Sequence, residues 1–180
     1  MRFEDILGNG RLWAVVYDGE EVDVLSKTLA DWMNPAYLGV FFSENEEDLE
    51  QYFHITNIDT AIFDTIVDAA SLSCIILDID PNANLDELFR PLENSRIREM
   101  LLSREKAKGK RQSGHSSWLR IYAIKLDPKV YLVTGGAIKL TPTMNEREHT
   151  RRELRRMDKV RSYLIENGII DAEGIIDYNS

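Results

Sequence analysis

Two different periods of apolar residues follow one another along this 180-residue chain. Residues 12–17 form an apolar run rich in β-formers, Asp18-Gly19 supplies a turn, and residues 22–25 alternate, which predicts an N-terminal β-hairpin. Between residues 26 and 73 apolar residues recur at spacings of three and four, which predicts a series of helices. The longest of these begins after Asn57, a suitable N-cap.

The second half of the chain carries the clearest strand pattern. Three extended runs rich in β-formers follow one another and predict a three-strand meander: residues 118–126, 130–134 and 137–140. Gly135-Gly136 separates the last two runs and predicts either a bulge or a close backbone approach, of which the bulge is the commoner. Thr143 and Glu146 have the spacing of a capping box, so a long helix is expected from there to Gly168.

These elements together predict an α+β fold with a small antiparallel sheet. The sheet would consist of the N-terminal hairpin and the C-terminal three-strand meander, with helices packed against it. A chain of 180 residues is about the size of one domain, so residues 1–180 are expected to form a single one. Within it, the sequence divides into a mostly helical segment (residues 1–89), the meander and long helix (residues 90–165) and a tail (residues 166–180).

Composition narrows the class of protein. Apolar residues make up 43% and charged residues 29% of the chain, which excludes a wholly disordered or collagen-like protein. The single cysteine, Cys74, lies in an apolar context and is expected in the core rather than as a nucleophile. With no apolar run of membrane-spanning length and no signal-peptide pattern, the sequence predicts a cytoplasmic protein that does not associate with a membrane.

Charge is distributed very unevenly. Residues 1–89 hold 3 Lys/Arg and 19 Asp/Glu, whereas residues 90–161 hold 19 Lys/Arg and 8 Asp/Glu. The last 19 residues, 162–180, hold four acids and no base. Such asymmetry indicates a polyanionic partner for the basic part, or mutual neutralisation of the two parts across the fold. A third hypothesis is that the acidic segment shields the basic one and so inhibits it.

Two patterns resemble metal sites, and neither is complete. Residues 78–86 place oxygen-bearing side chains as a calcium loop does, but Ala83 replaces the turn glycine and Phe89 the bidentate glutamate. His149 lies near Glu146 and Glu153 at helical spacing, without a second histidine or a cysteine nearby. We therefore expect no metal and no other cofactor.

Basic residues form the strongest candidate constellation. The predicted last helix carries a cationic face opposite its apolar stripe: Arg151, Arg152, Arg155, Arg156 and Lys159, with Arg147 and His149 near its start. Lys110 and Arg111 lie in a Gly/Ser-rich loop, Arg120 and Tyr122 share one face of a strand with Trp118, and Lys139 follows on the third run. Lys and Arg suit a phosphodiester backbone and the extra charge of its transition state. The alternative is a solvated helix face with long side chains extended along apolar surface.

The same stretches resemble a known family. The segments WLRIYAIK (residues 118–125) and VYLVTGGAIKLTPT (residues 130–143), followed by the Glu/Arg-rich helix, resemble the RelE/ParE toxin superfamily and most closely its HigB-like, phage-related branch. The resemblance covers about residues 96–165. It implies a small antiparallel sheet with helices on one side, RNA cleavage on ribosome-bound message, and inhibition by an antitoxin protein.

The resemblance also implies roles for individual residues. Arg120 would contact or polarise the scissile phosphate, and Lys139 would match a family lysine that is followed by threonine. Tyr122 is the third candidate catalytic residue, to stack on a base or to take part in proton transfer. The expected RNA-binding residues are Lys110, Arg111, Arg147, His149, Arg151 and Arg155. The chain is longer than typical members, and its acidic residues 1–89 have no counterpart in the pattern.

The sequence therefore predicts a RelE/HigB-like toxin that cleaves RNA through the 2′-hydroxyl without a metal ion, with RNA or the ribosome and an antitoxin as partners. Two alternatives stay open. One is a non-catalytic protein-binding module of the same fold, favoured by the lack of an evident acid/base pair. The other is a structural or regulatory domain with no nucleic-acid partner.

Overall fold

The structure is a computed structural model, and it describes residues 1–92, 102, 104–108 and 115–180. In this part of the chain a six-stranded mixed sheet is accompanied by seven helices, which confirms the predicted α+β class. The strands are β1 (Arg2–Asp5), β2 (Leu12–Val16), β3 (Phe89–Pro91), β4 (Arg104–Lys108), β5 (Leu119–Asp127) and β6 (Val130–Ile138). Their order across the sheet is β1-β2-β6-β5-β4-β3.

The sheet differs from the small antiparallel one that the sequence predicts. β2 pairs with β6 in parallel, and the remaining neighbours are antiparallel. The predicted N-terminal hairpin is wrong in its second strand, because β2 pairs with β1 instead of with residues 22–25. Those residues begin a helix, since the Asp23 carboxylate accepts hydrogen bonds from the backbone N–H groups of Leu25 and Ser26, both at 2.9 Å.

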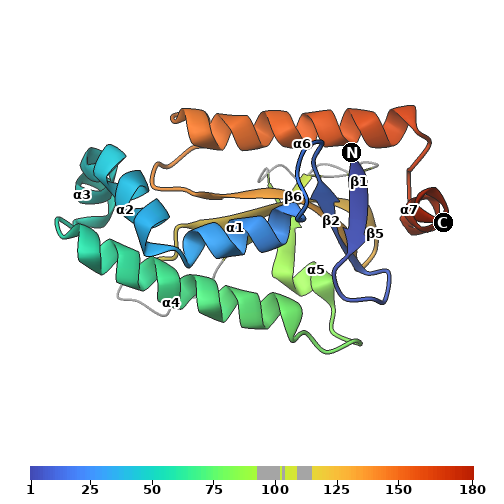
Figure 1. The fold of residues 1–180 in the computed structure, drawn as a ribbon, viewed down its shortest axis with the longest axis horizontal. Coiled ribbons are helices and arrows are strands. Elements are labelled where there is room, and N and C mark those ends of the chain that lie inside the picture. The colour runs from blue at the N-terminus through green and yellow to red at the C-terminus, as the bar shows by residue number, and fades with distance from the viewer. Residues whose placement is uncertain (93–101, 103, 109–114) are drawn as a thin grey trace.

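Helices cover both faces of the sheet (Figure 1). α6 (Glu148–Glu166) lies on one face, and α1 (Val24–Trp32) and α4 (Ile58–Leu77) lie on the other, beside α2 (Pro35–Glu44) and α3 (Glu46–Phe53). α5 (Leu85–Leu88) precedes β3, and α7 (Ala172–Asn179) follows α6 near β1. Because both faces are covered, the central strands are buried on both sides, and all five residues of β2 are buried.

α4 has an apolar outer side. Among the described residues it is the one helix that is long and apolar enough to cross a membrane, a test that core helices also pass. Its inner side is buried in the core, whereas Phe63, Val67 and Leu77 are exposed. Cys74 lies on the same outer side and is exposed, so the expectation that it belongs to the core is wrong. The apolar context in the sequence reflects the outer stripe of the helix.

The two adjacent glycines lie inside one strand rather than between two. β6 continues from Val130 to Ile138, so the predicted second and third runs of the meander form a single strand up to Ile138. Tyr122 pairs with Gly135 and Ala123 pairs with Val133, so Thr134 is an extra residue in β6 and forms a bulge directly before Gly135. A Cβ on Gly135 would overlap Oε2 of Glu153 on α6, and one on Gly136 would lie 2.7 Å from Thr28 of α1. Bulge and close approach therefore occur together.

Replacing Gly135 by alanine is expected to destabilise the protein by about 1–3 kcal/mol, because α6 must move away from the sheet. Urea denaturation measures the loss. In a Glu153→Ala background the same substitution should cost clearly less, because the overlapping carboxylate is gone. Gly39→Ala is the matched control, since its Cβ would meet only Ile62 at 4.0 Å, and it should be neutral or slightly stabilising. Equal costs with and without Glu153 would contradict this explanation.

Candidate functional site

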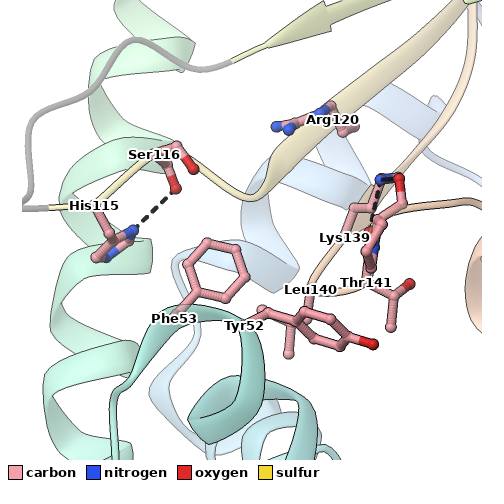
Figure 2. A pocket seen from close by; sticks show the side chains of 9 residues that line it. Tyr52, Phe53, His115, Ser116, Arg120, Lys139, Leu140 and Thr141 are labelled. Atoms are coloured by element: carbon pink, nitrogen blue, oxygen red, sulfur yellow. Dashed lines mark hydrogen bonds between the residues drawn. The ribbon is translucent and has the colours of Figure 1, made fainter.

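A pocket of about 390 Å³ opens where β5 begins and β6 ends (Figure 2). Four segments that are distant in sequence line it. They are the end of α3 (Tyr52, Phe53), the chain before β5 (His115, Ser116), β5 itself (Arg120), and the chain after β6 (Lys139, Leu140, Thr141, Pro142). Two of the residues singled out in the sequence, Arg120 and Lys139, therefore meet in one place.

Arg120 is the second residue of β5 and is half-buried. Its Nη1 donates to the carbonyl oxygens of Ser117 at 2.8 Å and Leu119 at 2.7 Å. Burial lowers the pKa of its guanidinium from the usual value, although arginine stays charged. No carboxylate forms an ion pair with it among the residues that the structure describes. A partly desolvated cation held only by carbonyl groups favours a bound anion.

Lys139 lines the pocket from the residue that directly follows β6, the strand next to β5. Ala137 lies opposite Arg120 in the sheet, and Lys139 follows two residues later on the same side. Its backbone N–H donates to the Trp118 carbonyl at 2.8 Å, which ties the two pocket walls together. Its Nζ donates to the carbonyl oxygens of Thr141 at 2.7 Å and Pro142 at 2.5 Å. The loop after β6 thus holds the ammonium group at the pocket.

His115 is a further polar side chain of the pocket that the sequence analysis missed. Its ring stacks on Trp118, with centroids 4.0 Å apart. Nε2 lies 3.1 Å from Oδ2 of Asp64, and Nδ1 lies 3.0 Å from the Ser116 carbonyl oxygen. A carboxylate and a carbonyl on either side of the ring fix its orientation in the pocket wall. Asp64 lies 51 residues away on α4, and no local pattern could have indicated this pairing.

Trp118 packs behind two residues of the pocket, Phe53 and His115, and the expectation that it shares a strand face with Arg120 is wrong. It precedes β5 and turns toward α4, where its Nε1 donates to Thr65 Oγ1 at 2.9 Å. It is fully buried and has edge contacts with Phe42 and Phe53. The alternation of side chains between the two faces of the sheet starts only after Trp118, because its ring packs against α2 and α4.

Tyr122 does share the face of Arg120, but it lies beneath α6. Its side chain is fully buried against Ala137 and Met157. Burial raises the pKa of its phenol, and within the described residues its hydroxyl has no hydrogen-bond partner. Because none of the ring is exposed, Tyr122 does not offer a surface for stacking on a base.

The predicted helix residues lie outside the pocket. Arg147 pairs with the buried carboxylate of Asp48, which raises the Arg147 pKa. His149 donates from Nε2 to the Ile138 carbonyl at 2.9 Å, and burial lowers its pKa. Arg151 and Arg155 both pair with Glu148 on the exposed side of α6. Lys110 and Arg111 lie outside the described residues.

Two residues of segment 78–86, which resembles a calcium loop in sequence, form hydrogen bonds within the fold. The Asn84 side chain accepts a hydrogen bond from the Asp86 backbone N–H and so caps α5. The Asp86 carboxylate accepts hydrogen bonds from Tyr131 at 2.5 Å and the Lys129 backbone at 3.1 Å, and it pairs with Lys125 at 3.0 Å. In the described ranges of the chain, no three His, Cys, Asp or Glu side chains are grouped so that they could hold a metal ion.

Comparisons of the chain with protein-family models, with curated proteins and with solved structures found no match. The protein can therefore be classified only by its structure. It is an α+β protein with a pocket that contains Arg120 and Lys139, at the start of β5 and the end of β6.

Proposed function

We propose that the protein binds RNA through this pocket and cleaves it without a metal ion, as the resemblance to RelE/HigB-like toxins implies. The observation that carries the proposal is the convergence of Arg120 and Lys139 on one open pocket, with His115 on its opposite side. A phosphodiester is the polyanion that such a group of cations suits. Ribosome-bound message and an antitoxin protein are the partners that the resemblance adds to the proposal.

The proposed reaction needs only charge stabilisation and one proton transfer. The 2′-oxygen of the RNA attacks the adjacent phosphorus, the bond between phosphorus and the 5′-oxygen breaks, and the proton of the 2′-hydroxyl ends on that 5′-oxygen. The products are a 2′,3′-cyclic phosphate and a 5′-hydroxyl. Arg120 and Lys139 would stabilise the additional negative charge of the transition state, which is their role in the mechanism.

One observation favours the alternative, a module that binds without cleaving. None of the described residues that line the pocket is acidic, and both nitrogens of His115 face hydrogen-bond acceptors. A general base is thus not in place in the structure as it stands. The two candidate functions share the phosphate contact and differ in whether the bond is broken.

Salt dependence tests the shared part of the proposal. With two or three cationic groups on the phosphates, affinity for a fluorescently labelled single-stranded RNA is expected to fall about 5- to 20-fold between roughly 50 and 200 mM salt. Fluorescence anisotropy on the purified full chain measures this. An affinity for RNA that does not change with salt concentration would contradict a phosphate-binding site.

The same samples test cleavage. Incubation with a chelator should leave the reaction unchanged and yield 2′,3′-cyclic ends, and an RNA with a 2′-deoxy sugar at the cut site should stay intact. Salt-dependent binding with no cleaved product would overturn the toxin and support the binding module.

A further inference from the structure

We propose that Tyr52 and Phe53 form a stacking subsite for one unpaired nucleobase, whose phosphate lies against Arg120 and Lys139. The inference rests on the proposed function for the phosphate, and it adds a substrate contact from α3. This helix belongs to the acidic segment, outside the part of the chain that resembles the toxin family.

The size and lining of the pocket point to more than a phosphate. Its volume of about 390 Å³ is within the range of roughly 300–1,000 Å³ that small-molecule sites occupy, and it far exceeds a phosphate group. The cationic groups take one side of it. The remaining wall combines the apolar or aromatic residues Tyr52, Phe53, Leu140 and Pro142 with the polar residues His115, Ser116 and Thr141. A nucleotide presents this combination of an anionic and a flat apolar end.

The two aromatic rings lie where such a base would enter. Figure 2 shows the Phe53 ring between His115 and Tyr52, with the Tyr52 ring toward Leu140 and Thr141. Phe53 packs edge-on, at 86° to Trp118 and at 81° to His115. The Tyr52 side chain is 36% exposed, so part of its ring is available to a ligand. Aromatic rings of this kind stack on bases of any identity.

α3 is held firmly enough to serve as a wall. Its Asp48 is buried and accepts two hydrogen bonds from Arg147, at 2.5 and 2.6 Å. Leu49 is fully buried, and the helix ends at His54 in the left-handed conformation, with its N–H bonded to the last turn. Arg147 therefore acts as a positioning residue for the pocket wall. A wall that is ordered in advance loses little entropy when a ligand binds.

The geometry also selects unpaired nucleotides. In a duplex both faces of a base are covered by its neighbours, and only its edges are available. Contact with the flat side of a ring requires a base that has left the stack. We therefore expect single-stranded RNA to bind and a perfect duplex to compete poorly.

Isothermal titration with adenosine 5′-monophosphate and ribose 5-phosphate tests the subsite, because the two ligands differ only in the base. The wild-type protein should bind the nucleotide about 5- to 150-fold more tightly, the value of one stacked base. Tyr52→Ala should reduce this ratio strongly while leaving affinity for ribose 5-phosphate unchanged. Tyr52→Phe should retain the ratio, because the ring and not the hydroxyl makes the contact. Tyr37→Ala, an exposed tyrosine on α2 outside the pocket, is the matched control and should change neither affinity.

Arg147→Ala separates positioning from contact, since it releases the ion pair that holds α3 but removes no residue that lines the pocket. It should lower the ratio and leave ribose 5-phosphate binding intact. Arg120→Ala should weaken both ligands equally. Equal affinity of the wild type for the two ligands would overturn the stacking subsite and leave the phosphate site standing. Failure of both ligands to bind would overturn the phosphate site and the subsite together.

Discussion

Replacing Arg120 and Lys139 together by alanine is expected to abolish RNA cleavage and the growth arrest that induced expression of the wild-type chain would cause. Each is expected to stabilise the charge of the reacting phosphate, and loss of one such group typically lowers the rate by about 10²–10³-fold. Both are only partly buried, so their removal should leave the fold intact, which circular dichroism would verify. The readouts are the cleavage rate of a labelled RNA and colony formation after induction.

A pair of arginines outside the pocket supplies the control. Arg151 and Arg155 carry the same charge, lie on the exposed side of α6, and pair with Glu148. Arg151→Ala with Arg155→Ala removes as much positive charge but spares the pocket, so cleavage should change little. Should this variant lose as much activity as the pocket variant, the helix face and not the pocket would be the site.

The sequence could predict part of this site because part of it is local. Arg120 lies on β5 opposite Ala137 of the neighbouring strand β6, and Lys139 follows Ala137 by two residues. Once these strands are taken as neighbours, period-2 alternation places Arg120 and Lys139 on one face of the sheet. The remaining walls depend on contacts between distant segments. His115 meets Asp64 of α4, and Tyr52 arrives on a helix that is locked by an ion pair between Asp48 and Arg147. Neither contact leaves a periodic signal.

The same limit explains the errors in the sheet. Period-2 alternation does not identify the partner of a strand: β2 pairs with β1, and residues 22–25 lie at the start of a helix that Asp23 caps. Gly135 and Gly136 were predicted to separate two strands, but they lie within β6, where the predicted bulge occurs and where α6 and α1 approach the strand from its two sides. A double glycine indicates turns and close approaches alike, and only tertiary packing decides between them.

The uneven distribution of charge along the chain corresponds to pairs between its acidic and basic parts. Acidic residues of the first part form specific pairs with the second part: Asp48 with Arg147, Asp64 with His115 and Asp86 with Lys125. The first two pairs lie beside the pocket, since Asp48 is on α3 and His115 lines the pocket, whereas Asp86 and Lys125 lie toward the other end of β5. The acidic segment thus contributes a wall of the candidate site. Residues of this segment also belong to the core that packs on the sheet, so its removal is expected to expose core residues.

Trp118→Ala is expected to cost about 3–5 kcal/mol of folding stability, the typical loss for a large aromatic side chain in a core. The ring is fully buried, joins α4 to β5 through Thr65, and supports His115 by stacking. Its removal should also loosen the pocket, because Phe53 and His115 both pack against it. Urea denaturation followed by circular dichroism gives the stability, and anisotropy at low urea gives the affinity for RNA.

Trp13→Ala distinguishes local support from general destabilisation. Trp13 is a buried tryptophan of β2 and donates from Nε1 to the Gly10 carbonyl at 3.0 Å, away from the pocket lining. The two variants should lose similar stability, since both leave a cavity of the same kind. Under conditions where both are folded, only Trp118→Ala should weaken RNA binding, since misplacing a binding group by about 1 Å can cost up to about 100-fold in function. Equal weakening by both variants would mean that stability alone governs binding, and Trp118 would then be a core residue with no separate influence on the site.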